Sequence, residues 1–238
     1  MVGIGPGDAL DRTRRAEAAI ARAQVVVGYS RYLKLIQDLT EGKELLSTGM
    51  TKEVERCLLA LRRAESGETV ALVSSGDSGI YGMAGLALEL AHKERVTVPI
   101  EVIPGVTSAT ALAARLGAPL MLDFAAISLS DLLIPWEVIR RRLEAVAAAD
   151  LVVALYNPRS RKRRKQLDEA AEIFRRRRPG ATPVGIGTSV GADEEEIIVS
   201  DLDHFLEFDI TMRSVLIIAN SVTKLLNGWL VTPRGYRV

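Results

Sequence analysis

Short apolar runs rich in β-branched residues alternate with longer segments of Ala, Leu, Arg and Glu along the 238-residue chain. Several runs are apolar at consecutive positions, as is typical of strands covered on both faces. In residues 51–66, Val54, Cys57 and Leu61 fall on one helical stripe, and Gly67 follows as a stop signal. The alternation predicts an α/β protein. The predicted strands are residues 2–5, 24–28, 45–47, 69–74, 98–103, 125–129, 151–156, 183–186, 196–200, 214–219 and 229–232.

The two halves of the chain differ in the order of these elements. The first half alternates strands and helices, which predicts a mostly parallel sheet. The second half ends in several strands with few helices between them, which predicts hairpins and a mixed sheet. Residues 115–119 (Arg-Leu-Gly-Ala-Pro) break the pattern between the halves. We therefore expect two α/β domains, residues 1–115 and 120–238. Only Met1 and Val2 precede Gly3, so either the first strand is short or the natural start lies upstream.

The composition excludes several classes of protein. With 31 Lys and Arg against 30 Asp and Glu, and 5% aromatic residues, a dedicated nucleic-acid binder is disfavoured. The apolar runs are too short to span a membrane, and no signal-peptide pattern is visible. A single cysteine, Cys57, excludes an internal disulfide and points to the cytoplasm. Cys57, His92 and His204 lack metal-ligand spacing, and no motif indicates covalent catalysis, so we expect no metal and no protein nucleophile.

Three glycine-bearing segments follow predicted strands: residues 3–8, 74–85 and 103–109. Glycine lets the backbone turn tightly and approach a ligand, and a helix that begins at residue 107 or 108 would favour a carboxylate. Open α/β sheets bind ligands at the carboxyl ends of their strands. The three segments together predict one small-molecule crevice. Each alone is equally consistent with a tight turn or a helix start, in which Asp8 or Asp77 acts as a cap.

A basic run covers residues 159–165, and a second cluster covers residues 175–178. A solvated helix face is the usual explanation for such runs. Two alternatives stay open: a nucleic-acid surface, and a grip on a small polyanionic substrate.

Residues 3–8, 75–82 and 104–109 together resemble the tetrapyrrole methylase family, and the match spans nearly the whole chain. This resemblance implies S-adenosyl-L-methionine (SAM) as methyl donor and S-adenosyl-L-homocysteine as product. It also implies two α/β domains with the active site in the cleft between them, and a homodimer. Other segments are similar to the branch that methylates C17 of a precorrin-3B or cobalt-factor III type tetrapyrrole, with ring contraction, in cobalamin (vitamin B12) biosynthesis. These segments are residues 27–29, 76–85, 127–133, 156–161 and 232–236.

The resemblance also implies roles for individual residues. The implied SAM contacts are Pro6, Ser75, Gly76, Asp77, Ile80, Tyr81, Thr107, Ser108, Tyr156, Asn157, Ser189 and Val190. Ring contraction moves protons, and the candidate acids and bases are Asp77, Ser130, Asp131 and Tyr156, with Asp123 and Ser128 as further positions to test. The substrate would be held by Arg31, Arg159 and Arg161, expected in loops after strands, and by Ser128. Asp131 is alternatively a cap for a helix near Pro135, and Ser78 and residues 187–189 depart from the family pattern.

Methyl transfer from a sulfonium requires two reactants held in line in a dry crevice, and no protein nucleophile. The expected partner is therefore a small tetrapyrrole, with no nucleic acid and no membrane. Three alternatives remain: a tetrapyrrole methylase acting at another carbon, a relative acting on a protein in diphthamide synthesis, and a basic nucleic-acid binding module. The residues do not decide whether the substrate carries cobalt.

Overall fold

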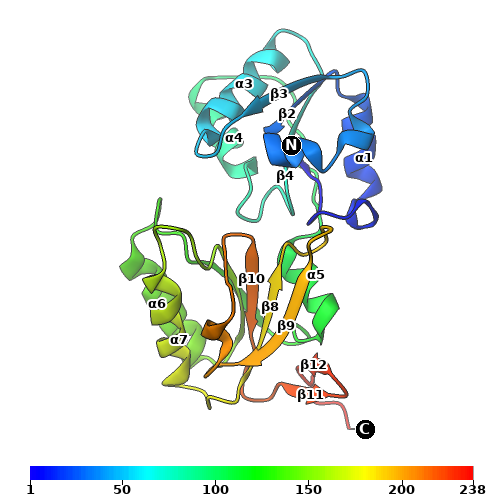
Figure 1. The fold of residues 1–238 in the computed structure, drawn as a ribbon. Helices are drawn as coiled ribbons and strands as arrows, with labels where there is room; N and C mark the ends of the chain where they lie inside the picture. The colour runs from blue at the N-terminus through cyan, green and yellow to red at the C-terminus, as the bar shows by residue number, and fades with distance from the viewer. Residues whose placement is uncertain (238) are drawn as a thin grey trace. The chain divides into compact units, whose positions relative to one another are not determined.

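The computed structural model describes residues 1–237, which form two compact units (Figure 1). The first unit is Met1–Thr107, and the second begins at Ser108. This division lies before the expected break at residues 115–119, because helix α5 (Ser108–Leu116) packs on the strands of the second unit. A Cβ built on Gly185 would lie 2.2 Å from Leu116 Cδ1, and one on Gly187 would lie 2.7 Å from Leu112 Cδ1. The leucines of α5 thus lie directly over glycines of the second unit's sheet.

The first unit contains a four-stranded parallel sheet of order β1-β4-β2-β3, which confirms the predicted parallel character. Its strands are β1 (Val2–Gly3), β2 (Val25–Tyr29), β3 (Glu44–Thr48) and β4 (Val70–Ser74). Its helices are α1 (Arg14–Arg22), α2 (Ser30–Lys34), α3 (Glu53–Glu65) and α4 (Ala84–Lys93), with 3-10 turns at Ala9–Asp11 and Gln37–Leu39.

Strand β2 shows how helices cover both faces of this sheet. Val26 packs in one apolar cluster with Ile20 of α1, whereas Val25 and Val27 pack on the other side with Cys57 of α3. Successive side chains of a strand point to opposite faces, so a strand buried on both faces must be apolar at every position. The consecutive valines of β2 meet this requirement.

The second unit contains a five-stranded mixed sheet of order β6-β7-β10-β8-β9, as expected. Strands β6 (Phe124–Ser128) and β7 (Val152–Tyr156) are parallel neighbours, and β8 (Pro183–Thr188), β9 (Glu196–Asp201) and β10 (Ser214–Ile218) join through antiparallel pairs. Helices α6 (Trp136–Ala148) and α7 (Lys165–Arg175) share a core with this sheet, and a 3-10 turn covers Phe205–Glu207. A small second sheet has the order β11-β12-β5, from Lys224–Leu226, Trp229–Val231 and Gly117–Ala118.

The predicted strand at residues 98–103 was wrong. In this segment Ile103 forms only a single bridge, to Val2, and no strand is present. Pro99 lies within the run and has no N–H to donate to a ladder, which opposes strand pairing. The short strands β5 and β11 were not predicted, because two or three residues carry too little pattern to detect.

We predict that Gly105→Ala destabilises the protein by about 1–3 kcal/mol. A Cβ at this position would lie 2.2 Å from the Gly76 carbonyl oxygen, which is backbone and cannot rotate away. The matched control is Gly85→Ala in α4, where a Cβ meets nothing within 4 Å. Chemical denaturation of both variants is the measurement, and equal stability of the two would contradict the account.

Candidate cofactor and substrate residues

The three glycine loops of the first unit meet at the carboxyl ends of adjacent strands β1 and β4. Gly5 N–H donates to Gly76 O at 3.1 Å, and Gly76 N–H donates back to Gly5 O at 2.6 Å. Gly3 N–H donates to Ile103 O at 3.0 Å, which brings in the third loop. The predicted gathering of these loops at one edge of the sheet is therefore present.

The glycines of these loops are close to one another rather than to open space. A Cβ on Gly3 would lie 2.8 Å from Gly105 N, and one on Gly82 would lie 2.4 Å from Ser78 O. The sequence predicts that these glycines allow tight turns and a close approach to a ligand. At Gly3, Gly82 and Gly105 the physical reason is instead that backbone packs against backbone, where no side chain fits.

The Asp77 carboxylate joins two of the loops. Its Oδ1 accepts from the N–H groups of Gly79 (2.7 Å) and Ile80 (3.1 Å), and its Oδ2 accepts from Gly105 N–H at 2.9 Å. The alternative role as a helix cap is wrong, because α4 begins at Ala84 with Met83 at its N-cap. Asp77 therefore fixes the shape of the loop edge.

Ser78 forms a second link between these loops. Its buried hydroxyl donates to Ile103 O at 3.0 Å. Two large side chains of the same loop are exposed, Ile80 at 42% and Tyr81 at 53%, and Tyr81 has a left-handed backbone with φ of 53°. Ser75, Gly76 and Thr107 are half-buried beside them. The edge thus offers both apolar and polar groups.

Two residues cap the helical turns after β1: Asp8, as the sequence predicts, and Thr13. The Asp8 side chain accepts from Leu10 N–H at 2.8 Å and caps the 3-10 turn Ala9–Asp11. The helix proper, α1, begins at Arg14, and the Thr13 hydroxyl accepts from Ala16 N–H at 3.1 Å. Pro6, at the start of this connection, is half-buried.

In the second unit, the ends of β6 and β7 lie side by side, with Ser128 opposite Tyr156. Asn157 Nδ2 donates to Ser128 Oγ at 3.0 Å, and Ser128 Oγ also accepts from Ser130 N–H at 3.2 Å. The Tyr156 hydroxyl accepts from Ala109 N–H at 3.2 Å, in the first turn of α5 that Ser108 begins. Four of the predicted site residues are therefore neighbours in one network.

Asp131 does not cap a helix, since α6 has Pro135 at its N-cap. Its Oδ2 accepts from Gln166 Nε2 at 2.7 Å, and its Oδ1 lies 3.8 Å from Arg163 Nε. Asp123 is exposed and precedes β6. Asp123 is thus at the opposite end of β6 from Ser128, away from the other candidate acids and bases of this unit.

The predicted substrate arginines have different environments. Arg159 Nη2 pairs with Asp168 at 2.6 Å, while its buried Nε has no hydrogen-bond partner. Arg161 is exposed after β7, as expected. Arg31 is exposed too, but it lies in helix α2 rather than in a loop. Helix α2 (Ser30–Lys34) follows β2 directly, without a loop. No helix start signal in the sequence indicated this.

Ser189 and Val190 form the turn after β8. Ser189 has a left-handed backbone with φ of 51°, and its N–H donates to Arg213 O at 3.0 Å. Its hydroxyl is buried without a hydrogen-bond partner, and Val190 is buried. A buried hydroxyl that makes no bond is costly unless a ligand supplies one.

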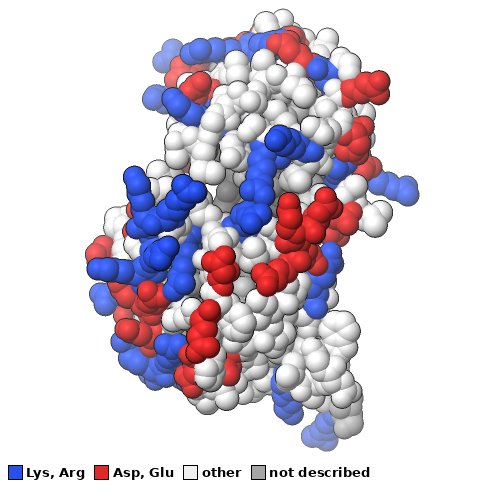
Figure 2. Space-filling view, viewed as in Figure 1, with Lys and Arg blue, Asp and Glu red and all other residues white. Residues whose placement is uncertain are grey.

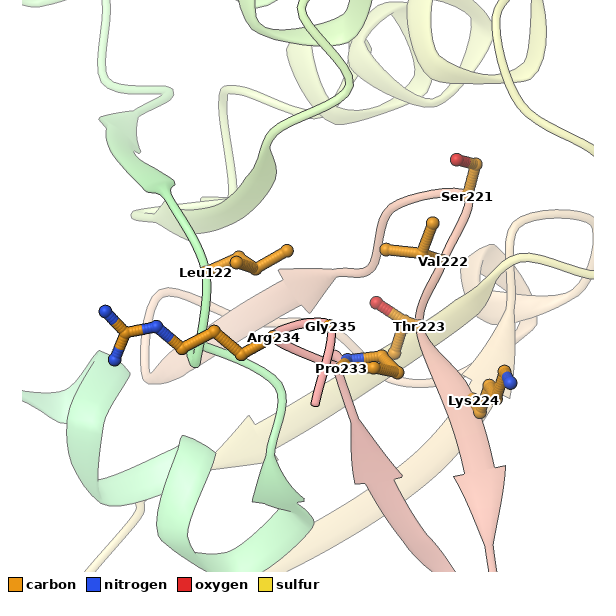
Figure 3. A pocket seen from close by; sticks show the side chains of 8 residues that line it. All are labelled: Leu122, Ser221, Val222, Thr223, Lys224, Pro233, Arg234 and Gly235. Carbon is orange, nitrogen blue, oxygen red and sulfur yellow. The ribbon is translucent and has the colours of Figure 1, made fainter. Parts of the chain in front are cut away.

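The visible charged surface and one cavity, both among residues 1–237, show no convergent charge. In Figure 2, Lys and Arg side chains on the visible face of the second unit lie among Asp and Glu side chains. A cavity of about 610 Å³ is lined by Leu122, Ser221, Val222, Thr223, Lys224, Pro233, Arg234 and Gly235. Figure 3 shows the cationic ends of Arg234 and Lys224 on opposite sides of it, pointing apart. They do not converge on one anion.

Within residues 1–237, no His, Cys, Asp and Glu side chains are grouped so that they could hold a metal ion. None of the helices in the same range has the length and apolar character that crossing a membrane requires. Cys57 is fully buried in the core between α3 and the sheet, as its helix stripe predicted.

Comparison with known proteins assigns the class. The model of the tetrapyrrole (corrin/porphyrin) methylases matches residues 1–205, so the chain belongs to this family. The chain is 45% identical over 236 residues to the "Probable cobalt-factor III C(17)-methyltransferase" of Salmonella typhimurium strain LT2, covering 99% of this chain and 98% of that one. It is 44% identical over 241 residues to the "Cobalt-factor III methyltransferase" of Priestia megaterium, and spans 45% of that longer protein. The crystal structure of the methyltransferase CobJ superposes with a TM-score of 0.90 at 36% identity, covering 98% of each chain.

We predict that Cys57 does not react with a thiol reagent in the native protein at pH 8. Burial raises the pKa of the Cys57 thiol to about 11, so the reactive thiolate is scarce and shielded. Absorbance on reaction with a chromogenic disulfide measures this, and one thiol per chain should react after denaturation. Rapid labelling of the native protein would contradict the burial.

Proposed function

We propose that this chain is a SAM-dependent methyltransferase that methylates C17 of cobalt-factor III or precorrin-3B, with ring contraction, in cobalamin biosynthesis. The observation that carries the proposal is the 45% identity over nearly the full length of both chains to a relative named for this reaction. The gathered loops at the carboxyl end of the first sheet support it, because ligands of open α/β sheets bind there.

The residues present fit SAM as cofactor. SAM combines an aromatic base with ribose hydroxyls and a charged amino-acid end, and the first unit's loop edge pairs exposed Ile80 and Tyr81 with half-buried Ser75 and Thr107. The buried, unpartnered Ser189 hydroxyl is a position where a ligand group would satisfy a protein group. Asp77 differs from the other predicted contacts, because three backbone N–H groups already donate to its carboxylate. We therefore assign it to loop shape rather than direct contact.

The proposed SAM contacts are the predicted ones other than Asp77: Pro6, Ser75, Gly76, Ile80, Tyr81, Thr107, Ser108, Tyr156, Asn157, Ser189 and Val190. When bound, SAM supplies an electrophilic methyl group, so no protein nucleophile is required. The chain's own task is to hold the acceptor carbon in line and to exclude water.

For the protons of ring contraction we propose the group at the ends of β6 and β7. Ser130, Asp131 and Tyr156 lie there, and Asp131 is held in place by Gln166. A carboxylate and hydroxyls at one place can donate and accept protons at different atoms. The family resemblance supports a homodimer, and the single cysteine favours the reducing cytoplasm.

The direct test incubates the protein with methyl-labelled SAM and, separately, cobalt-factor III and precorrin-3B. We expect one methyl group to be added to one of the two, and NMR to place it at C17 of a contracted ring. Mass spectrometry counts the methyl groups added, and calorimetry measures the binding of S-adenosyl-L-homocysteine. A methyl group at another carbon would instead identify a different tetrapyrrole methylase. If the protein does not bind S-adenosyl-L-homocysteine, the assignment of SAM as cofactor is wrong.

We predict that Arg159→Ala raises the KM for the tetrapyrrole by about tenfold or more, since a hydrogen bond to a charged group contributes roughly 1.5–3 kcal/mol. The affinity for S-adenosyl-L-homocysteine, measured by calorimetry, should stay nearly unchanged. Asp168→Asn is the matched control: it releases Arg159 from its 2.6 Å ion pair and leaves the guanidinium in place. If both variants weaken substrate binding equally, the ion pair matters and Arg159 does not contact the substrate.

A further inference from the structure

One arginine of the basic run is not on the surface. Arg163 is 8% exposed, whereas Arg161, Lys162 and Arg164 around it are exposed. Burial lowers the pKa of the Arg163 guanidinium, and the Asp131 carboxylate opposes this effect. A charge is kept at such a buried position only where several hydrogen bonds compensate for the lost water.

The compensating groups belong to two different segments. Arg163 Nη1 donates to Leu129 O at 2.9 Å and to Asn157 O at 2.6 Å, and lies 3.5 Å from Pro158 O. Leu129 is the first residue after β6, and Asn157 is the first after β7. One guanidinium therefore joins the segments that follow two parallel neighbouring strands.

The loop that carries Arg163 is itself closed. Arg163 N–H donates to Ser160 Oγ at 3.1 Å, and Ser160 N–H donates to Arg163 O at 2.9 Å. This pair of hydrogen bonds fixes the backbone position of Arg163, from which its side chain extends. Asn157, at the other end of the loop, has a left-handed backbone with φ of 50°, a conformation that needs support in a residue other than glycine.

We propose that Arg163 is a positioning residue for the methylation and ring contraction. It fixes residues 128–131 and 156–159 relative to each other, and these segments carry Ser130, Asp131, Tyr156 and Arg159. The inference rests on the proposed function for its consequence in catalysis, but the contacts themselves do not depend on it. Lysine is a poor replacement, because both carbonyl bonds come from Nη1, which lies one bond further from the backbone than a lysine Nζ would, and because lysine lacks the Nε that faces Asp131.

The same sheet contains a natural control at its other end. Arg178 is 4% exposed, donates from Nη1 to Ala219 O at 2.5 Å and from Nη2 to Leu151 O at 2.7 Å, and lies 3.4 Å from Asp150. Leu151 precedes β7, whereas Asn157 follows it. Arg163 and Arg178 thus bind backbone carbonyls at opposite ends of one strand, and only Arg163 lies among the proposed site residues.

The experiment compares Arg163→Lys with Arg178→Lys by thermal unfolding, steady-state kinetics and amide hydrogen exchange. Both variants should lower the Tm. Arg163→Lys should also lower kcat for the tetrapyrrole by roughly tenfold to a hundredfold, as misplaced reacting groups do. The change in KM should be smaller, because Arg161 lies outside the two joined segments and Arg159 keeps its ion pair with Asp168. Arg178→Lys, assayed below its Tm, should keep kcat within about twofold of the parent protein, because its contacts are remote from those groups.

Hydrogen exchange separates the inference from the proposed function. Arg163→Lys should speed exchange in both residues 128–131 and 156–159, and Arg178→Lys should speed it near residues 150–152 and 219–221. Exchange that rises in only one of the first two segments, or in neither, overturns the inference even if the parent enzyme methylates C17. Loss of kcat in equal measure in both variants also overturns it, since Arg163 would then be merely structural. A parent protein inactive on tetrapyrroles overturns the proposed function, while the exchange result still decides whether Arg163 joins the segments.

Ser160→Ala provides a second route if Arg163→Lys does not fold. It removes the hydroxyl that accepts from Arg163 N–H and leaves the guanidinium and its acceptors intact. We expect the same two segments to exchange faster, with a kcat loss smaller than that of Arg163→Lys. Unchanged exchange in both segments would contradict the role of the closed loop.

Discussion

The first unit depends on the contact of backbone with backbone where its three glycine loops meet. Gly3, Gly76 and Gly105 approach so closely that a Cβ on Gly105 would lie 2.2 Å from a carbonyl oxygen. Once the loops are this close, their peptide groups must pair with one another, and Asp77 and Ser78 complete the set. The edge that remains open to a ligand is thus built on a rigid base, which suits a site that must hold two reactants in line.

The second unit achieves a similar result by other means. No comparable glycine contact joins the ends of β6 and β7 among the described residues; side chains join them instead. Asn157 Nδ2 reaches Ser128 Oγ, and Arg163 reaches Leu129 and Asn157 carbonyls. A link made by a side chain can be changed by substituting that residue, whereas a contact between glycine backbones leaves no room for any larger residue. Differences in specificity between related enzymes are therefore easier to accommodate in this unit, and its candidate acids and bases lie beside those links.

The sequence was sufficient for the features that depend on apolar pattern. The valines of β2 and the stripe of α3 predict their burial on two faces, because burial needs only the residue's own chemistry. The boundary between the two units was not predictable from residues 115–119. Helix α5 belongs to the second unit because its leucines pack on the glycines of β8, and the sequence does not show this contact. The glycine loops were recognised, but the backbone contacts that require Gly3, Gly82 and Gly105 were not, because a sequence does not show which backbones come together.

Arg163 shows why a functional role can escape a reading of sequence. Its acceptors are backbone carbonyls, which every residue has, so no motif marks them. In the sequence it is one cation in a basic run, and the usual explanation for such a run is a solvated face. Burial is what distinguishes it, and burial there is expensive: replacing a buried charge by a packed apolar group often stabilises a protein. This chain has two such arginines, one at each end of β7. Arg178 holds the backbone at the start of the strand, which is a structural role. Arg163, at the other end, holds in mutual position the groups that would handle the substrate.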